Sequence, residues 1–333
     1  MLVFCPCHFR NKRNGKSILA PWKGGRILRV LRNAPFPQMI RLSREELAQR
    51  VGYATADTIK RIERERYIPR EEDYSILLEA TGINPSLHRQ IMRTLNLLNV
   101  PQRSLEPAKI LSPFKEWLKE APWPSLVLDS FGDIVLLNEG VLWFHGLPDF
   151  SRLPQKMDFN VLWWLFSNDM GGLFSQIRGS SIEELEIARE MSYWFLRASI
   201  GYIDECYWWY RFEKLSGSTS SKDDRVSVFF IGGVGWAWQH MVPWGSFKPK
   251  ITFRRPDGKE FEVWLDVALV ETPYGDLYWV KYIPASRKQG AFMEVPQRVH
   301  TLAPWPLSRK KIPEGWQPRA KYLRYLPERC HDA

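Results

Sequence analysis

The chain has 333 residues, of which 44% are hydrophobic and 25% are charged. This length allows two or three domains with buried cores, and this composition excludes a disordered chain, a collagen and a coiled-coil rod. Basic side chains outnumber acidic ones by 16 to 5 in residues 1–70 and by 10 to 4 in residues 285–333, whereas residues 111–284 hold 17 basic and 23 acidic side chains. Basic ends around an acidic centre indicate a polyanionic partner for the ends and a different task for the middle.

The cysteine content and the apolar segments bear on the compartment. Four cysteines are too few and too scattered for a disulfide framework, so we expect a reducing, cytoplasmic compartment. The first residues place apolar side chains before basic ones, the reverse of a signal peptide. The uncharged stretch from Val226 to Phe247 has the length of a membrane span, but it contains four glycines and Pro243. Buried core is therefore favoured over a membrane helix, and we expect no membrane partner.

Residues 21–100 show the spacing of short helices separated by breaks. Residues 26–32 form an amphipathic stretch that ends before a Pro-Phe-Pro sequence, which cannot continue a helix. Ser43 and Glu46 have the spacing of a capping box, which predicts the start of a second helix. Gly52 is expected to end that helix, because glycine adopts the left-handed conformation of a C-cap.

A third helix is predicted at residues 57–64, after a tight turn, with Ile59 and Ile62 facing inward. Further helices are expected between Pro69 and Leu98. Two short helices joined by a tight turn, the second basic on its outer face, are typical of a helix-turn-helix that reads the major groove of duplex DNA. The alternative is a head that binds another protein, since such folds also serve as interaction modules. The outward basic side chains of the third helix are Lys60, Arg61 and Arg64.

The spaced residues of this head carry a family resemblance. Leu42-Ser43-x-Glu45-Glu46-Leu47-Ala48-x4-Gly52, followed by Thr58-Ile59-x2-Ile62-Glu63 and Pro69, resembles the xenobiotic-response-element (lambda repressor/Cro-like) helix-turn-helix family. The resemblance implies that Glu63 pairs with an arginine of the first helix, Arg32 or Arg29. Many members have a glycine near the position of Glu65. The DNA-contacting residues that the resemblance implies are Arg44, Thr55, Ala56, Asp57, Thr58, Lys60, Arg61 and Arg64.

Asp57 has a second interpretation from the residue type alone. Acidic side chains are preferred at helix starts, where they accept hydrogen bonds from backbone N–H groups and face the positive end of the helix dipole. On this ground an N-cap role is favoured over contact with a cytosine.

After a proline-containing linker at residues 101–112, the composition changes, and 13 of the 16 tryptophans fall between Trp117 and Trp279. Apolar runs at residues 125–129 and 133–138 flank a turn and predict a hairpin. A second hairpin is predicted at residues 251–255 and 261–265, and a last strand pair at residues 267–270 and 277–283. Strands at both ends with helices between them predict an α+β domain with an antiparallel sheet over residues 113–285.

This middle region carries a second resemblance. The motif Asp129-x2-Gly132-x-Ile134-x3-Asn138 resembles the opening hairpin of PAS-like sensor domains. The segments Trp123-Pro124-Ser125-Leu126-Val127-Leu128-Asp129, Asn160-Val161-Leu162-x2-Leu165-Phe166, Leu196-Arg197-Ala198 and Asp276-Leu277-x3-Lys281-Tyr282-Ile283-Pro284 are similar to the ligand-binding domain of MmyB-like transcription regulators. The resemblance implies a bacterial regulator in which an apolar cavity holds a small, fatty-acid-like ligand behind a Cro-like head.

Clustered aromatic side chains can line an apolar pocket, or they can simply fill a core. Adjacent residues of a helix do not share one face, so one member of each tryptophan pair should face a second helix, a partner subunit, a ligand or solvent. The candidates for a ligand pocket or interface are Trp163, Trp164, Trp194, Trp208 and Trp209.

The sequence lacks several common catalytic and metal-binding motifs. The sequence has no Gly-x-Ser-x-Gly elbow, His-Glu-x-x-His helix or phosphate loop, so we expect no enzyme and no cofactor. The rival is a hydrolase or oxidoreductase that uses His145, His240 or Cys206. Cys5-x-Cys7-His8 with Cys330-His331 contains soft ligands, but its cysteines lie closer together than in structural zinc sites, so we expect no metal.

Residues 1–20 are expected to form a basic, disordered arm, and residues 286–333 a basic, proline-containing tail that contacts phosphates or packs elsewhere. The sequence thus predicts a multidomain protein, in which an all-α helix-turn-helix head precedes an α+β PAS-like domain with an antiparallel sheet and inserted helices. The expected function is a cytoplasmic, nucleoid-associated bacterial transcription regulator. Its expected partners are double-stranded DNA, a small apolar ligand and a second copy of the chain.

Overall fold

The computed structural model describes residues 23–34, 39–99, 106–146, 160–161, 191–215, 250–255, 257–272, 274–290 and 298–318. Several expectations lie outside these residues, and three of them concern whole segments. They are the basic arm at residues 1–20, the apolar stretch at residues 226–247, and the cysteine and histidine cluster of the two chain ends. Among the described residues, no helix has the length and apolarity needed to cross a bilayer.

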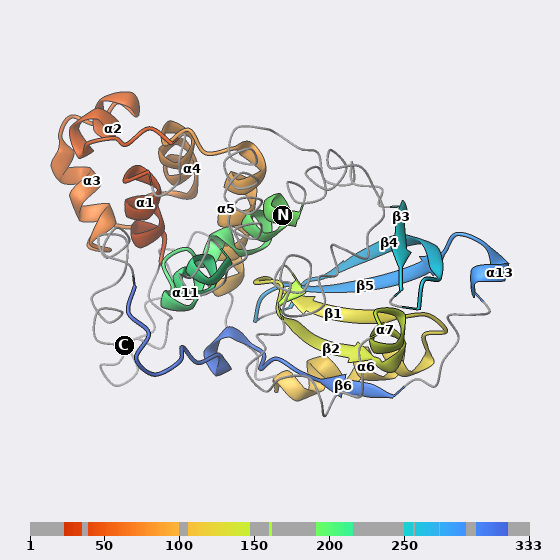
Figure 1. Ribbon diagram of the computed structural model, residues 1–333. Coiled ribbons are helices and arrows are strands. Elements are labelled where there is room, and N and C mark those ends of the chain that lie inside the picture. The colour runs from red at the N-terminus through yellow and green to blue at the C-terminus, as the bar shows by residue number, and fades with distance from the viewer. Residues whose placement is uncertain are drawn as a thin grey trace, which may run out of the picture.

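Five helices form the head (Figure 1), and they begin and end near the breaks that the sequence indicates. The expected capping box is present, because Ser43 accepts from the backbone N–H of Glu46 while the Glu46 carboxylate accepts from the backbone N–H of Ser43. Gly52 has a φ of 75°, as a C-cap glycine requires. The helices are α1 (Gly24–Arg32), α2 (Arg44–Arg50), α3 (Ala56–Glu63), α4 (Glu71–Ala80) and α5 (Pro85–Asn99).

The head has an apolar core to which every helix contributes fully buried side chains, among them Leu28, Leu47 and Ile62. Helices α1 and α3 approach so closely that a Cβ atom on Gly25 would overlap the carbonyl oxygen of Ile62. Only glycine fits at this position without movement of the α3 backbone.

The second region is built on a six-stranded antiparallel sheet in the order β3-β4-β5-β1-β2-β6. An all-α head followed by an α+β domain was the predicted fold class, and it is confirmed. The strands are β1 (Ser125–Asp129), β2 (Ile134–Asn138), β3 (Lys250–Arg254), β4 (Glu260–Val270), β5 (Leu277–Pro284) and β6 (Val299–Thr301).

Three elements differ from the sequence-based expectation. Residues 261–265 and 267–270 form one continuous strand, β4, because Asp266 lies opposite Lys281 of β5 and is ion-paired with it. Helix α6 (Pro107–Glu120) begins inside the expected linker, since proline is well tolerated at the first position of a helix. Strand β6 comes from the basic tail and pairs with β2. It has only three residues, too few for a sequence pattern to predict the strand or its partner.

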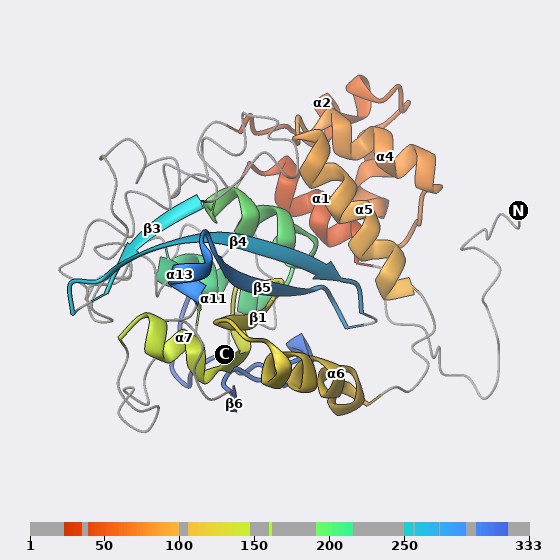
Figure 2. The same ribbon diagram turned by 90° about the vertical axis from the view of Figure 1, so that its right-hand side faces the viewer.

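Helices cover the two faces of the sheet. On one face, α6 packs Leu111, Phe114 and Leu118 against β1 and β2. The opposite face packs against α7 (Glu139–Phe144) and against Ala198 of the helix at residues 191–199. Figure 2 shows α6 on the side of the sheet away from the head.

The segment at residues 191–215 joins the two regions. It continues from the helix at residues 191–199 through the 3-10 turn η4 (Ile200–Tyr202) into α11 (Cys206–Leu215). Figure 1 shows α11 between the head helices and the sheet. Its side chains belong to the same apolar cluster as the core of the head. The head is therefore docked on the α/β domain through a shared core.

Candidate functional site

The recognition helix of the head is α3, and its start differs from the expectation for Asp57. Thr55 is the N-cap, with an extended backbone at φ −147° and ψ 151°, and the helix begins at Ala56. The N-cap interpretation of Asp57 is therefore wrong. Asp57 lies in the first helical turn, where its carboxylate still faces the positive end of the helix dipole.

One face of α3 is buried, and the other carries polar side chains at the surface. Ile59 and Ile62 are fully buried, as expected. Every residue proposed to contact DNA remains at least partly exposed. Thr55, Asp57, Arg61 and Arg64 are exposed, and Arg44, Ala56, Thr58 and Lys60 are half-buried. This arrangement allows α3 to enter a major groove while basic side chains reach the phosphates.

The loop after α3 adds cations that the family resemblance did not single out. Arg66 and Arg70 are exposed and continue the basic surface beyond the helix. The sequence signal for them is that four arginines fall within residues 61–70.

Glu63, the last residue of the recognition helix, is ion-paired with two arginines. Its side chain is 1% exposed, and its carboxylate accepts from Arg32 Nε at 2.5 Å and from Arg44 Nε at 2.7 Å. Arg32 also donates to the carbonyl oxygen of Leu42 at 2.7 Å. The predicted pairing of Glu63 with a helix-one arginine is confirmed for Arg32, and the second pairing, with Arg44, had no sequence signal.

This second pairing changes the role that Arg44 can take. The Nε atom of Arg44 is engaged by Glu63, while 38% of its side chain is exposed. Contact between Arg44 and DNA stays a prediction, and such contact would come from a guanidinium already oriented by a buried carboxylate.

Glu65 lies near the position where the family resemblance implies a glycine, and its backbone conformation is one that glycine adopts readily. Its φ is 58°, in the left-handed region that disfavours residues with a Cβ atom. Its carboxylate pairs with Arg26 of α1, with 2.9 Å between Arg26 Nε and Glu65 Oε1. The ion pair thus holds a residue whose backbone conformation is unfavourable.

The candidate pocket tryptophans lie in different surroundings. Trp208 and Trp209 are fully buried in the core shared with the head, where their indole N–H groups donate to Ser199 Oγ at 2.9 Å and to the Ile203 carbonyl oxygen at 2.8 Å. Trp194 is half-buried and packs edge-on against Tyr278 of the sheet. Trp163 and Trp164 lie outside the described residues. A ligand-contacting role for these five residues stays a prediction.

Polar contacts fasten the head to the α/β domain in addition to the shared core. Arg93 of α5 reaches the turn between β4 and β5, with 2.8 Å from its Nη2 atom to Asp276 Oδ1 and 2.7 Å to Glu271 Oε1. Next to it, a Cβ atom on Gly201 of η4 would overlap the side chain of Thr94. A change in the α/β domain can therefore be transmitted to α5 without a flexible connection.

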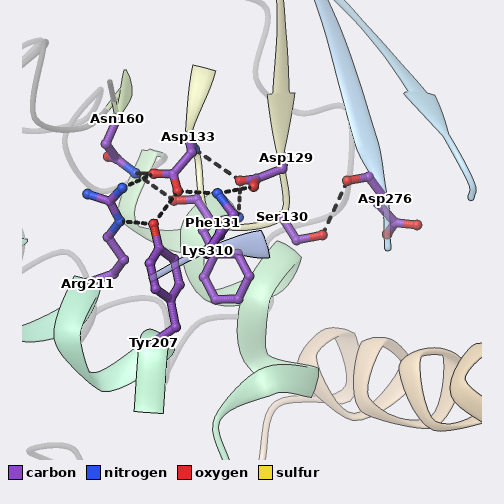
Figure 3. Close-up of polar contacts among 9 residues, drawn as sticks. All are labelled: Asp129, Ser130, Phe131, Asp133, Asn160, Tyr207, Arg211, Asp276 and Lys310. Atoms are coloured by element: carbon purple, nitrogen blue, oxygen red, sulfur yellow. Dashed lines mark hydrogen bonds and ion pairs between the residues drawn. The ribbon is translucent and has the colours of Figure 1, made fainter. Parts of the chain in front are cut away.

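A buried charge cluster lies where the β1–β2 turn, α11 and the tail meet (Figure 3). Asp133 Oδ1 lies 2.9 Å from Arg211 Nη2 and accepts from Asn160 Nδ2 at 3.0 Å. Tyr207 donates to Asp133 Oδ2 at 2.6 Å and accepts from Arg211 Nε at 2.7 Å. Lys310 of the tail inserts between Asp133 and Asp129. The basic tail thus supplies a structural cation to the α/β domain.

The two aspartates of this cluster differ in electrostatics. Burial raises the pKa of Asp133, but the charges of Arg211 and Lys310 outweigh it and hold that pKa well below its usual range. Burial also raises the pKa of Asp129, and there the charge of Lys310 does not fully compensate. Both carboxylates depend on nearby cations to remain charged in the interior.

Other features of the described residues bear on the alternatives. A cavity of about 470 Å³ lies between α4 and α5, and its lining includes Met92 together with Ser75 and His88, which lie 3.1 Å from each other. His145 is buried and packs against Phe144, Phe253 and Tyr282. Cys206 is disulfide-bonded, which differs from the reduced cysteines that the sequence led us to expect, so it is not a free thiol nucleophile. No group of three or more potential metal-ligating side chains occurs within the described part of the chain.

Comparison with known proteins gives one family match. Residues 25–91 match the family model of a helix-turn-helix domain, which spans α1 to α4 and the first part of α5. The match supports DNA binding and regulation as the role of the head. No curated protein matches the chain.

Proposed function

We propose that this protein is a sequence-specific DNA-binding transcription regulator, and that a small apolar ligand in its α/β domain changes its affinity for an operator. The observation that carries the proposal is the recognition helix. Its apolar face is buried in the head, its N-terminal residues are exposed, and its outer face bears Lys60, Arg61 and Arg64. Exposed polar residues at the start of such a helix can read bases, and the arginines can neutralise phosphates.

The α/β domain supports the sensor part of the proposal. Its sheet opens with the Asp129–Gly132 turn that suggested a PAS-like domain, and one sheet face carries apolar and aromatic side chains such as Phe253, Phe261 and Tyr278. These side chains are buried in a core with Phe144 of α7, and a ligand that enters such a core has to be largely hydrocarbon. The shared core and the Arg93 contacts provide a route from that domain to the head.

The proposed mechanism is thermodynamic linkage. A ligand that binds one conformation of the α/β domain better than another shifts the population of the docked head and so changes its affinity for DNA. We further propose a homodimer, because two heads on two half-sites read an operator with higher specificity than one head does.

The test is selection of sheared genomic DNA by the purified full chain at near-physiological salt, followed by sequencing. We expect enrichment of a two-fold-symmetric site, which is lost when Thr58 and Lys60 are both replaced by alanine. The matched control replaces Lys115 and Lys119, which are exposed on α6 away from the head, and should retain the enrichment.

Recovery of no site would contradict the proposal, and so would recovery only of DNA that modest salt removes. A generic polyanion surface releases DNA steeply with salt and without sequence preference. In that case the head would instead be assigned to protein interaction. The ligand part is tested separately, by mass spectrometry of small molecules that copurify with the folded protein and by their effect on operator affinity.

A further inference from the structure

Lys310 lies in an unusual place for the side chain of a basic tail. It follows the 3-10 turn η5 (Leu307–Arg309), and its side chain is 1% exposed. Its Nζ atom lies 2.6 Å from Asp129 Oδ2 and is ion-paired and hydrogen-bonded to Asp133 Oδ2. The neighbouring residues Arg309 and Lys311 are exposed, so this insertion is specific to one residue of the basic run.

Two aromatic rings complete the surroundings of this ammonium group. The Nζ atom lies 5.2 Å from the ring centroid of Tyr207 and 5.8 Å from that of Phe131. Two carboxylates and two ring faces around one cation form an ammonium cage, in which the cation gains both charge pairing and cation–π attraction (Figure 3).

The walls of this cage are held in place by groups other than Lys310. Asp129 Oδ1 accepts from the backbone N–H groups of Phe131 at 2.9 Å and of Asp133 at 3.1 Å. On the other side, Asp133 and Tyr207 are both bound by Arg211. Removal of Lys310 would therefore leave an organised cage in which two buried carboxylates share only one cation, and a buried uncompensated charge favours the entry of another cation.

We propose that the cage of Asp129, Phe131, Asp133 and Tyr207 is a binding site for a primary alkylammonium group, which this chain fills in cis with Lys310 and which a small primary amine fills when that side chain is absent. A primary ammonium carries three N–H donors, and both carboxylates can accept from it. A quaternary ammonium has none, so it cannot satisfy the carboxylates of an enclosed site.

The position of the cage links its occupancy to the head. Tyr207 and Arg211 lie on α11, and Trp208, Trp209 and Phe212 of the same helix pack in the core of the head. Loss of the cation from the cage should loosen α11 and, with it, the docking of the head. This second consequence rests on the proposed function, because it is read out as affinity for DNA.

The experiment is chemical rescue of the full-length Lys310→Ala variant, followed by its thermal unfolding temperature. The atoms that this substitution removes beyond Cβ correspond to n-propylammonium, so methyl-, ethyl-, n-propyl- and n-hexylammonium chloride form a size series. Sodium chloride and tetramethylammonium chloride at equal ionic strength are the salt controls. Lys311→Ala, at the exposed neighbouring position, is the matched protein control.

We expect Lys310→Ala to unfold several degrees below the wild type. We also expect n-propylammonium to raise its unfolding temperature in a saturable manner, because a ligand that binds only the folded state stabilises it by mass action. The other chain lengths should raise the temperature less, and the double variant Asp129→Asn, Lys310→Ala should lose most of the effect. Lys311→Ala should show no response beyond that of the wild type.

An equal response of Lys310→Ala to n-propylammonium and to tetramethylammonium would overturn the proposal, as would an equal response of Lys311→Ala. If Lys310→Ala is insoluble, the soluble yield after refolding with and without n-propylammonium replaces the melting temperature, and an unchanged yield counts against the cage. Operator affinity of the rescued variant tests the link to the head. Because rescue of folding is measured without DNA, it succeeds or fails independently of the DNA-binding proposal.

Discussion

Two buried carboxylate clusters, one in each region of the molecule, solve the same electrostatic problem in different ways. Glu63 in the head is held by Arg32 and by Arg44, whose side chain is 38% exposed. Asp133 in the α/β domain is held by Arg211 and Lys310, whose side chains are 7% and 1% exposed. The cluster in the head remains open to solvent through one arginine, whereas the cluster in the α/β domain is enclosed and joins three distant segments.

The two clusters are suited to different tasks. Arg44 has one nitrogen on a buried carboxylate, and the rest of its side chain stays partly exposed and accessible to a partner. A lysine enclosed between carboxylates is unsuited to phosphate contact, and it closes the tail onto the domain. Whether a basic residue can contact phosphate therefore depends more on its surroundings than on the net charge of its segment.

The largest loss of stability is expected from a change in the enclosed cluster. Asp133→Asn leaves Arg211 and Lys310 with one carboxylate in the interior, and removal of one partner of a buried ion pair costs about 3–5 kcal/mol of unfolding free energy. Glu63→Gln should cost less, since water can reach Arg44. Urea unfolding of both variants measures the difference, and an equal or greater loss for Glu63→Gln would contradict it.

Asp204 carries a third buried carboxylate, and its surroundings differ from those of Glu63 and Asp133. Asp204 lies between η4 and α11, and neither of its carboxylate oxygens accepts a hydrogen bond from another described residue. Burial raises its pKa to about 7, a change that Glu205 adds to and that Lys23, the N-cap of α1, and Arg26 oppose. Its charge also acts on the buried hydroxyl of Tyr74. This aspartate is therefore expected to titrate near neutral pH.

The sign of the pH effect follows from the raised pKa. The folded state holds the Asp204 proton more tightly than the unfolded state, so the stability linked to it is complete below about pH 4 and is lost as the pH rises through about 7. We compare the unfolding free energy of Asp204→Asn with that of the wild type at each pH. This difference should grow in favour of the variant by roughly 2–4 kcal/mol from pH 4 to pH 8, at about 1.4 kcal/mol per pKa unit. Unfolding free energies at several pH values test this, with the exposed Glu116→Gln as control. A variant with the pH profile of the wild type would show that Asp204 does not titrate in this range.

Gly25 lies in the interior of the head, and Gly201 lies at the junction of the head with the α/β domain. Gly25→Ala should cost about 1–3 kcal/mol, because its Cβ would meet the backbone of Ile62, which cannot be trimmed. Gly201→Ala meets the side chain of Thr94 instead. Its cost should fall in a Thr94→Gly background, whereas no side-chain change should relieve Gly25→Ala. Denaturant unfolding of the double-mutant cycle checks this, and additive effects of the two changes at the junction would disprove the contact.

The smallest expected effect concerns Glu65. Glu65→Gly removes the ion pair with Arg26 and also the left-handed strain, so the two contributions should cancel to within about 1 kcal/mol. Glu65→Gln keeps the strain and loses the charge pairing, so it should be the less stable of the two. Thermal unfolding of both variants measures the order, and the reverse order would show that the left-handed backbone costs less than the side-chain contacts that glutamine keeps.

The head could be predicted from the sequence because its signals are local. The capping box at Ser43 and Glu46, the C-cap at Gly52 and the apolar spacing of Ile59 and Ile62 each involve residues within a turn or two. The same holds for the β1–β2 hairpin. Short-range hydrogen bonding and the helical or strand period determine such elements, so a contiguous pattern is sufficient to predict them.

The enclosed cluster and the junction were decided by the tertiary structure alone. Asp133 and Lys310 are 177 residues apart in the sequence, and Arg93 and Asp276 are 183 apart. The tail could have contacted phosphates or packed elsewhere. No pattern in the tail favours Lys310 over Arg309 or Lys311. Which cation pairs with the two buried carboxylates depends on which one the packed chain brings next to them. In the interior, the attraction of an ion pair offsets the cost of desolvation only where the geometry is complete.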